Sequence, residues 1–354
     1  MTVVILGAEG FIGLALRRRL APHHRLLSVD IRPITPVRAI CGFDGVEESL
    51  LRCDLGDPHA VDDMVQWLEQ CAPVTAIVHL AAYYDFANRP DPRYRRLESG
   101  LARLMSRLDE SISEKTPLIY ASSMAALEST DPGKPLGPNA PKHSGWQYPR
   151  HKVACEKILD ETPTNRAVIQ LVLAGVYSDC AELVPLYQQL RRVASGSIES
   201  MLYPGMIDRG LTYVHRDDAV EAFALAVERF KGVHDERARL MIGEPEPVTY
   251  ETIHGRASEI MRGRRLPLLR IPSWIAWVGG GVLSLLGRMI GRRRFVQPWM
   301  VRYAGEHFEL DTSVAQTRLG WSARHRLSER LTRIVEFAKY HPTLFEELNR
   351  MRPW

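Results

Sequence analysis

The sequence predicts an α/β protein in which a doubly wound parallel sheet is joined to a smaller C-terminal region. Short β-branched runs alternate with amphipathic stretches up to about residue 180. The first run, residues 2–6, passes directly into a glycine-rich turn and a helical pattern. After Tyr177 the spacing becomes irregular and prolines and glycines increase, which indicates a region built differently.

Each expected element follows from its local pattern. Asp57 and Pro58 are typical of a helix N-cap followed by a proline in the first turn. A further strand-to-helix unit is expected at residues 211–215, with Asp217 or Asp218 capping the helix. Strands are expected near residues 2–6, 25–30, 48–53, 74–80, 117–122 and 166–173, and helices near residues 11–20, 58–71, 93–113 and 147–161.

These elements divide the chain into three parts. Residues 1–180 are expected to form the sheet domain, which also recruits about 211–243. Residues 181–210 and 244–330 form the second region, and residues 331–354 form a C-terminal helical tail. At 354 residues the chain is long for one domain, which agrees with one large domain carrying an elaborated region.

Composition is that of an ordinary globular protein, with 25% charged and 45% apolar residues. A net charge of +4 is too small to indicate a nucleic-acid partner. The first residues form a strand with no basic segment before it, so we expect no signal peptide and a cytoplasmic protein. Five scattered cysteines without a C-x-x-C pair predict free thiols and neither a metal site nor a disulfide framework: Cys41, Cys53, Cys71, Cys155 and Cys180.

The glycines after the first strand predict a dinucleotide site. Gly7 allows a tight strand-to-helix turn, Gly10 allows the backbone to approach a pyrophosphate, and Gly13 allows the helix to pack closely on the strand. The helix N-terminus presents free N–H groups to phosphates. Asp30 ends the second strand, where its carboxylate can accept hydrogen bonds from both hydroxyls of the adenosine ribose.

Asp30 also predicts which dinucleotide binds. A carboxylate at this place repels a 2′-phosphate, so we expect NAD rather than NADP. Arg32 lies two residues later and is the one feature of this turn that suits a 2′-phosphate.

A tyrosine and a lysine four residues apart, Tyr148 and Lys152, supply a candidate for acid–base chemistry. On a helix this spacing places both on one face, so the ammonium group can lower the pKa of the phenol. Ser122 and Ser123 end the apolar strand that precedes this helix, and hydroxyls at a strand's carboxyl end point into the ligand crevice. Residues 83–86, which read Tyr-Tyr-Asp-Phe, follow the fourth strand, and Trp146 lies just before Tyr148. Their aromatic side chains are candidates for the substrate pocket or for packing.

The chain resembles the extended short-chain dehydrogenase/reductase superfamily, the NAD-dependent epimerase/dehydratase type, which has a Rossmann-type sheet. The glycine turn, Asp54-Leu55, residues 79–82, Ser122-Ser123 and the tyrosine–lysine pair stand in the family's order and spacing. Residues 317–321 resemble its C-terminal L-G-W element. The resemblance implies that Tyr148 is the catalytic acid/base, that Lys152 activates it and binds the nicotinamide ribose, and that Ser123 bonds the reacting oxygen.

The resemblance also implies a set of NAD contacts and a homodimer. In relatives, helices corresponding to those near 93–113 and 147–161 pair across a dimer interface. A small-molecule substrate is expected in the second region. The residues implied to contact NAD are Gly7, Gly10, Phe11, Ile12, Gly13, Asp30, Arg32, Asp54, Leu55, Leu80, Ala81, Ala82, Ser122, Tyr148, Lys152 and Val176.

Departures from the family pattern bear on the substrate. Residues 124–127 read Met-Ala-Ala-Leu where the family has V-Y-G, and residues 171–177 lack an expected Arg-Pro pair. Leu211 stands where nucleotide-sugar enzymes carry a phosphate-binding arginine. We therefore expect an apolar or lipid-like secondary alcohol. A nucleotide sugar stays open through Arg191, Arg192 or Arg209, and so does an inactive NAD-binding subunit.

Residues 271–287 form an uncharged stretch with two tryptophans and three consecutive glycines, flanked by arginines up to residue 294. A spanning helix needs roughly 20 apolar residues, and this stretch is shorter and interrupted by glycine. A buried helix of the second region is the first interpretation. Contact of residues 271–294 with a membrane surface is the second, because arginines beside an apolar, tryptophan-bearing helix suit anionic lipid.

Overall fold

The computed structural model describes the chain except for residues 42–44, 72, 86–87, 197, 279–297 and 350–354. Its centre is a seven-stranded parallel sheet with the strand order β11-β6-β5-β4-β1-β2-β3. The strands are β1 (Thr2–Leu6), β2 (Arg25–Asp30), β3 (Glu48–Arg52), β4 (Val74–His79), β5 (Leu118–Ser123), β6 (Val168–Leu173) and β11 (Arg237–Ile242). The predicted doubly wound α/β fold is confirmed.

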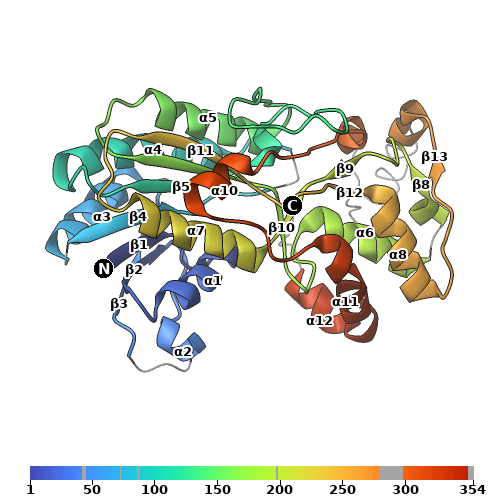
Figure 1. Cartoon of the computed structure of the whole chain (residues 1–354), viewed down its shortest axis with the longest axis horizontal. Coiled ribbons are helices and arrows are strands. Elements are labelled where there is room, and N and C mark those ends of the chain that lie inside the picture. The colour runs from blue at the N-terminus through green and yellow to red at the C-terminus, as the bar shows by residue number, and fades with distance from the viewer. Residues whose placement is uncertain (42–44, 72, 86–87, 197, 279–297, 350–354) are drawn as a thin grey trace.

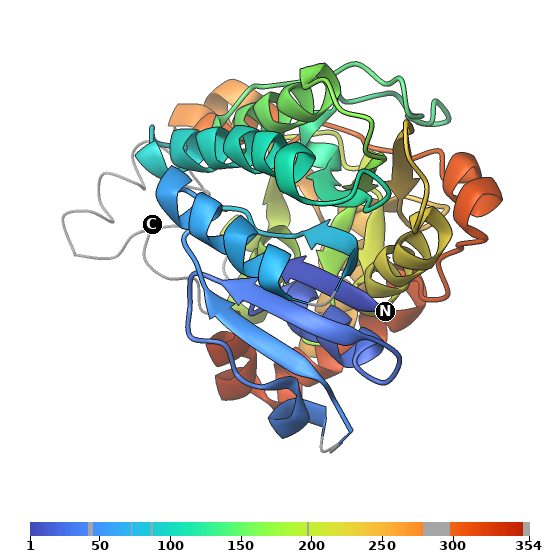
Figure 2. The ribbon, with the colours of Figure 1, turned by 90° about the vertical axis from the view of Figure 1, so that its left-hand side faces the viewer.

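Helices cover both faces of this sheet (Figures 1 and 2). One face packs on α1 (Phe11–Leu20), α7 (Arg216–Phe230) and α10 (Ser313–Leu319) in one apolar cluster. The other face packs on α3 (Pro58–Gln70), α4 (Pro92–Ser111) and α5 (Gln147–Glu161) in a second cluster. The predicted strands and helices up to β6 lie within about two residues of these bounds, as expected for boundaries drawn from periodicity.

The second region lies beside the carboxyl edge of the sheet and packs around a third apolar cluster (Figure 1). Its helices are α6 (Val184–Ser195), α8 (Tyr250–Arg262), α11 (Leu327–Tyr340) and α12 (Pro342–Leu348). Its short strands are β7 (Gly175–Tyr177), β8 (Leu202–Tyr203), β9 (Gly210–Leu211), β10 (Tyr213–His215), β12 (Val248–Thr249) and β13 (Leu269–Arg270). The described elements also include a short α2 (Val37–Cys41), the 3₁₀ helices at Met124–Ala126, Ile198–Met201 and Pro298–Tyr303, and the helical residues 273–278.

The prediction for residues 211–215 was right that a strand leads into a helix, since β10 passes directly into α7, but its strand bounds and its cap were wrong. The stretch is divided between β9 and β10, which pair with β12 and β7 and not with the central sheet. The N-cap of α7 is His215, whose Nδ1 accepts a hydrogen bond from the backbone N–H of Asp217. Asp217 and Asp218 lie inside the first turn instead, and Asp218 accepts bonds from the backbone N–H groups of Arg324 and His325.

Two glycines fix how closely the glycine turn packs. Gly7 has a φ of +92°, and an added Cβ there would lie 2.7 Å from the backbone nitrogen of Ala81. A Cβ on Gly13 would overlap the carbonyl oxygen of Gly7. These contacts bring β1, α1 and the end of β4 together, which is the arrangement that the sequence pattern predicts.

A methyl group at residue 13 should therefore loosen this junction. We expect Gly13→Ala to lower the free energy of unfolding by about 1–3 kcal/mol and to weaken NADH binding, because α1 must shift away from β1. Thermal denaturation and NADH fluorescence titration measure both effects. Gly137→Ala is the control, since its Cβ would meet its nearest neighbour at 3.9 Å. Equal behaviour of the two variants would contradict the close-packing role of Gly13.

Candidate active site

A cavity of about 530 Å³ lies at the carboxyl ends of β1, β2, β3 and β4. In doubly wound sheets this edge is where ligands bind. The cavity brings together nine of the residues expected to contact NAD. Eight further residues line it: Ile31, Cys53, Gly56, Tyr83, Tyr84 and, from α4, Arg93, Arg96 and Leu97. The nine are Gly7, Gly10, Asp30, Arg32, Asp54, Leu55, Leu80, Ala81 and Ala82.

The N-terminus of α1 faces this cavity with the features of an anion site. Gly10 is the N-cap and supplies no side-chain hydrogen bond, and the first turn contains no acidic residue. The N–H groups and the helix dipole are thus available to a pyrophosphate. Phe11 and Ile12 are half-buried on the first turn, and the Arg216 guanidinium lies 5.3 Å from the centre of the Phe11 ring.

Asp30 is held in place at the far side of the cavity. Its carboxylate accepts hydrogen bonds from the backbone N–H of Glu9 at 2.8 Å and from that of Arg32 at 2.9 Å. The Arg32 side chain also donates to it at 3.2 Å. Arg32 is therefore paired with the carboxylate, which supports a ribose diol more than a 2′-phosphate.

A buried ion cluster supports the glycine turn from behind. Arg17 is fully buried on α1 and contacts Glu9 at 2.7 Å and Glu48 at 2.9 Å. Glu48 also accepts a hydrogen bond from Ser28 at 2.6 Å. These groups connect α1, β2 and β3. Local spacing in the sequence gave no indication of them.

Tyr148 and Ser123 meet at the end of β5. The Tyr148 ring is half-buried at the start of α5, and burial of its hydroxyl raises the pKa of Tyr148 to about 12. A hydrogen bond with Ser123 acts in the opposite direction on that pKa. Ser123 also accepts a hydrogen bond from the backbone N–H of Ala125, which fixes its side chain. A phenol in this setting needs a positive charge nearby to act as a base at neutral pH.

Lys152 supplies that charge one helical turn later. Its side chain is buried, and its Nζ donates to the Ala121 carbonyl at 2.8 Å and to the Tyr120 hydroxyl at 3.2 Å. The Nζ lies 5.9 Å from the centre of the Tyr148 ring. Burial lowers the pKa of Lys152 to about 8. The three predicted catalytic residues are thus brought together.

Sequence reasoning missed the polar groups behind these residues. The Ser122 hydroxyl donates to Glu156, which is fully buried and paired with Arg239 at 3.0 Å and Lys142 at 3.1 Å. The Ser122 side chain is therefore engaged with α5, and only its backbone remains for the predicted NAD contact. The i,i+4 spacing of Lys152 and Glu156 on α5 is the one sequence signal that could have indicated Glu156.

A second missed group lies on the other side of Lys152. His151 contacts Glu98 of α4 at 3.0 Å and the Cys155 sulfur at 3.7 Å. Burial raises the pKa of the Cys155 thiol to about 11, so the thiol stays protonated and inert at neutral pH. These side chains tie α5 to α4 and so hold Lys152 in place.

Aromatic rings extend outward from Tyr148. Its ring centre lies 4.5 Å from that of Tyr84 and 5.8 Å from that of Trp146. Trp146 lies 5.4 Å from Trp299. A cavity of about 450 Å³ adjoins this row and is lined by Asn88, Gly145, Ser273, Trp274, Trp277, Trp299, Val301, Arg302 and Tyr303.

Leu211 and the three arginines proposed from the sequence each contact other parts of the protein in this structure. Leu211 pairs with β12 and packs in the apolar clusters of the core. Arg209 bonds the Thr130 carbonyl at 3.2 Å and Asp131 at 2.9 Å. Arg191 pairs with Glu346 at 3.3 Å, and Arg192 bonds the Leu202 carbonyl at 3.3 Å. Arg302, which no sequence motif indicated, is the arginine among the described residues that line the aromatic cavity.

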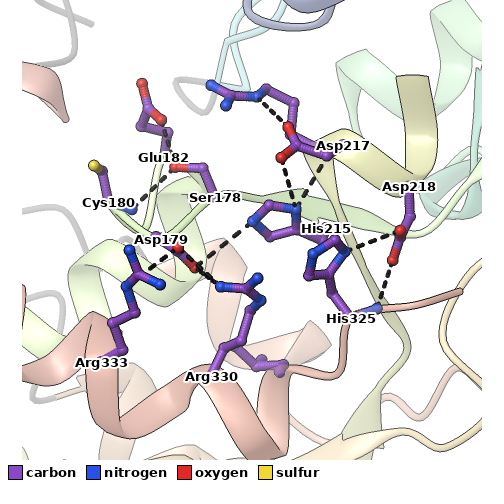
Figure 3. Close-up of polar contacts among 12 residues, drawn as sticks. Ser178, Asp179, Cys180, Glu182, His215, Asp217, Asp218, His325, Arg330 and Arg333 are labelled. Carbon is purple, nitrogen blue, oxygen red and sulfur yellow. Dashed lines mark hydrogen bonds and ion pairs between the residues drawn. The ribbon is translucent and has the colours of Figure 1, made fainter. Parts of the chain in front are cut away.

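Val176, the last predicted NAD contact, is half-buried on β7 and leads into a polar cluster shown in Figure 3. Asp179 contacts Arg330 at 2.8 Å and His215 at 3.7 Å. The rings of His215 and His325 lie 4.4 Å apart, and His325 bonds Asp218 at 2.9 Å. The cluster joins α11 to β10 and the N-terminus of α7, so it positions the loop after Val176. In the part of the chain that the structure describes, no group of His, Cys, Asp or Glu could hold a metal ion.

The chain belongs to the NAD dependent epimerase/dehydratase family, whose model matches residues 3–243. This confirms the resemblance inferred from the motifs. The comparison with curated proteins gave no match. Members of the family and several solved neighbours bind NAD, which agrees with the glycine-lined cavity.

Solved structures of similar fold cover almost the whole chain. UDP-glucose-4-epimerase from Stenotrophomonas maltophila, solved with NAD and formylated UDP-arabinopyranose, is 18% identical, with a TM-score of 0.69 and 97% and 99% of the two chains covered. UDP-glucose 4-epimerase from Thermotoga maritima, solved with UDP-glucose, is 18% identical, with a TM-score of 0.68 and 97% and 100% covered. MoeE5, solved with UDP-glucose and NAD, is 21% identical, with a TM-score of 0.66 and 97% and 100% covered.

The Asp30 carboxylate should set the preference between dinucleotides. We expect Asp30→Asn to weaken NADH binding about tenfold and to raise the ratio of NADPH to NADH affinity, because a charged acceptor for the ribose is lost and the repulsion of a 2′-phosphate disappears. Fluorescence titration with both cofactors measures the ratio. Asp63→Asn, at an exposed position of α3, should leave it unchanged. An unchanged ratio in Asp30→Asn would contradict the assignment of Asp30 to the ribose.

Proposed function

We propose that the protein is an NAD-dependent enzyme that oxidises or epimerises a secondary alcohol. The observation that supports this most is the meeting of Tyr148, Ser123 and Lys152 beside a glycine-lined cavity at the carboxyl edge of the sheet. NAD, when bound, supplies the hydride acceptor. The remaining chemistry belongs to the side chains of this chain.

Each catalytic residue has a separate role in the proposal. Ser123 donates a hydrogen bond to the substrate oxygen and positions it. The Tyr148 oxygen takes the hydroxyl proton as the alcohol carbon loses its hydride, and in an epimerase it returns that proton when the hydride comes back to the other face. Lys152 stabilises the phenolate and binds the nicotinamide ribose. Positioning and electrostatic stabilisation provide most of the acceleration.

A nucleotide sugar is the substrate class that the comparisons favour, in place of the apolar alcohol expected from the sequence. Similar solved structures hold UDP-glucose, UDP-glucuronic acid or another UDP-sugar. Arg302 adds a local reason, because a diphosphate needs a fixed cation and this guanidinium lines the cavity beside Trp299. Arg302 also faces Glu306 and opposes the rise in the pKa of that buried carboxyl.

An apolar secondary alcohol is the second candidate, and the aromatic row favours it. Tyr84, Trp146 and Trp299 extend from Tyr148 into a cavity that also receives Trp274 and Trp277. Burying apolar ligand surface there gains roughly 25 cal/mol per Å². Leu211 is packed in the core and gives no cation to a phosphate.

Two further features of the proposal come from the sequence alone. We keep the cytoplasm as the expected location and a homodimer through α4 and α5 as the expected assembly. The contrary hypothesis is that the protein is an inactive NAD-binding subunit. Such a subunit would not need the complete set of serine, tyrosine and lysine, so the presence of all three residues favours the enzyme.

Replacing Tyr148 tests the reaction. We expect Tyr148→Phe to lower turnover by about 10²–10⁴-fold while NADH affinity stays within about twofold, because only the proton acceptor is lost. The assay presents NAD with UDP-sugars and with sterol-like and terpenoid alcohols, and it follows both NADH absorbance and product stereochemistry. Tyr340→Phe, an exposed residue of α11, is the control. Full turnover in Tyr148→Phe would refute the role of Tyr148, and silence of the wild type over the panel would favour the inactive subunit.

The same panel separates the two substrate classes. Turnover of UDP-sugars that falls about tenfold or more in Arg302→Gln would support the nucleotide-sugar candidate, because a charged contact to the diphosphate is lost. Turnover of apolar alcohols alone, unchanged in Arg302→Gln, would contradict it.

The lowered pKa of Lys152 predicts a pH dependence of cofactor binding. The ammonium form is present below about pH 8 and is lost above it, since its pKa lies below the ordinary value of 10.5. We therefore expect NADH affinity to fall as the pH rises through about 8. Lys152→Arg should remove this fall, because a guanidinium stays charged, and Lys157→Arg on the same helix should keep it. The same decline in Lys152→Arg would contradict the assignment.

A further inference from the structure

One stretch of the sequence carries charge of a single sign. Every charged residue between Glu259 and Glu306 is an arginine, and there are nine of them, although the whole chain has a net charge of only +4. The same stretch contains the tryptophans Trp274 and Trp277. In a sequence, arginines concentrated beside tryptophans are typical of a segment that contacts an anionic surface.

The described part of this stretch exposes large apolar side chains to solvent. Residues 273–278 are helical, and Trp274 is 69% exposed and Trp277 60% exposed. Ile275 and Val278 are exposed beside them, and Leu269 is exposed on β13. Clustered exposed apolar residues of this size mark an interaction surface more often than scattered ones do.

Backbone contacts attach this stretch to the end of the second region. β13 pairs with β8 in parallel, the Ile271 N–H donates to the Tyr203 carbonyl at 2.9 Å, and the Ser273 hydroxyl donates to the Pro204 carbonyl at 3.1 Å. β8 and β13 lie at the end of the molecule remote from the sheet domain (Figure 1). This end is therefore accessible to a large partner.

Arginines accompany these apolar residues on the same stretch. Within the described chain, no ion pair engages Arg264 or Arg270. Arg265 has one weak partner, Glu251 at 3.6 Å. We name the set formed by Arg264, Leu269, Arg270, Trp274 and Trp277 the basic–aromatic face.

We propose that the basic–aromatic face docks on an anionic lipid surface. Arginines are attracted to anionic headgroups, and tryptophans prefer the boundary between headgroups and acyl chains. A lipid surface thus matches both the charge and the apolar side chains, whereas an acidic protein partner would match the charge alone. No described helix is long and apolar enough to cross a membrane, so the face lies on the surface.

The position of this face has a consequence for substrate access. Trp274 and Trp277 also line the aromatic cavity, which reaches Trp146 and Tyr148 through Trp299. Docking places the opening of that cavity against the lipid. An apolar alcohol dissolved in the bilayer then enters without crossing water. The docking itself does not depend on which substrate the enzyme takes.

Vesicle flotation of the full chain tests the proposal. Vesicles of phosphatidylcholine alone are compared with vesicles that also contain phosphatidylglycerol. We expect binding to the anionic vesicles only, weakening as salt is raised, with a blue shift of tryptophan fluorescence. Arg264→Glu with Arg270→Glu should weaken binding at least about tenfold, and Trp274→Ser with Trp277→Ser should weaken it and remove the blue shift.

Matched controls separate the face from general charge and hydrophobicity. Arg229→Glu and Tyr340→Ser, both exposed on other elements, should bind as the wild type does. Absence of binding, equal binding to neutral vesicles, or full binding by the face variants would overturn the proposal. So would conversion of a wild-type dimer to a monomer by Trp274→Ser with Trp277→Ser, because the face would then contact a second copy. These readouts use no substrate, so they are independent of the proposed reaction.

Discussion

Enclosure of the Tyr148 hydroxyl is the constraint on which the rest of the site depends. Removal from water raises the pKa of the phenol to about 12, which is the wrong direction for a base at neutral pH. The Ser123 hydrogen bond acts against this rise. In the proposed mechanism the Lys152 ammonium, whose Nζ lies 5.9 Å from the centre of the Tyr148 ring, also stabilises the phenolate. Lys152 is itself buried, so its own pKa falls to about 8, and its charge requires support.

That support comes from groups far apart in the sequence. The Ala121 carbonyl and the Tyr120 hydroxyl accept hydrogen bonds from Lys152, and Glu156 raises the Lys152 pKa from its place one turn further along α5. Glu156 is paired with Arg239 of β11. β11 is an edge strand of the central sheet and comes from residues 237–242, far along the chain from α5. The electrostatics of the catalytic pair therefore depend on assembly of the complete seven-stranded sheet.

The parts of the fold that were predicted correctly are those determined by local pattern. The turn from β1 into α1 is encoded in Gly7, Gly10 and Gly13. The need for glycine at these positions can be recognised from the strand pattern before them and the helix pattern after them. The spacing of Tyr148 and Lys152 is fixed by one helix. At residues 211–215 the strand-to-helix unit was correct, but the strand bounds were wrong. The stretch is divided between β9 and β10, which pair with β12 and β7, and no local alternation reveals this. His215 as an N-cap was missed because histidine rarely takes that position. Arg302 and Glu98 were missed for a similar reason, since tertiary packing alone brings them to the site.

The pKa of Tyr148 in the NAD complex tests the central claim most directly. Tyrosine ring carbons labelled with ¹³C report ionisation by NMR, and Tyr148→Phe identifies the resonance. We expect the Tyr148 signal to show no titration up to about pH 10 in the free protein. With NAD bound, its titration should move to lower pH, and Lys152→Met should abolish this movement. A Tyr148 signal that titrates alike with and without NAD, or that moves equally in Lys152→Met, would contradict the assignment of Tyr148 as a base activated by Lys152.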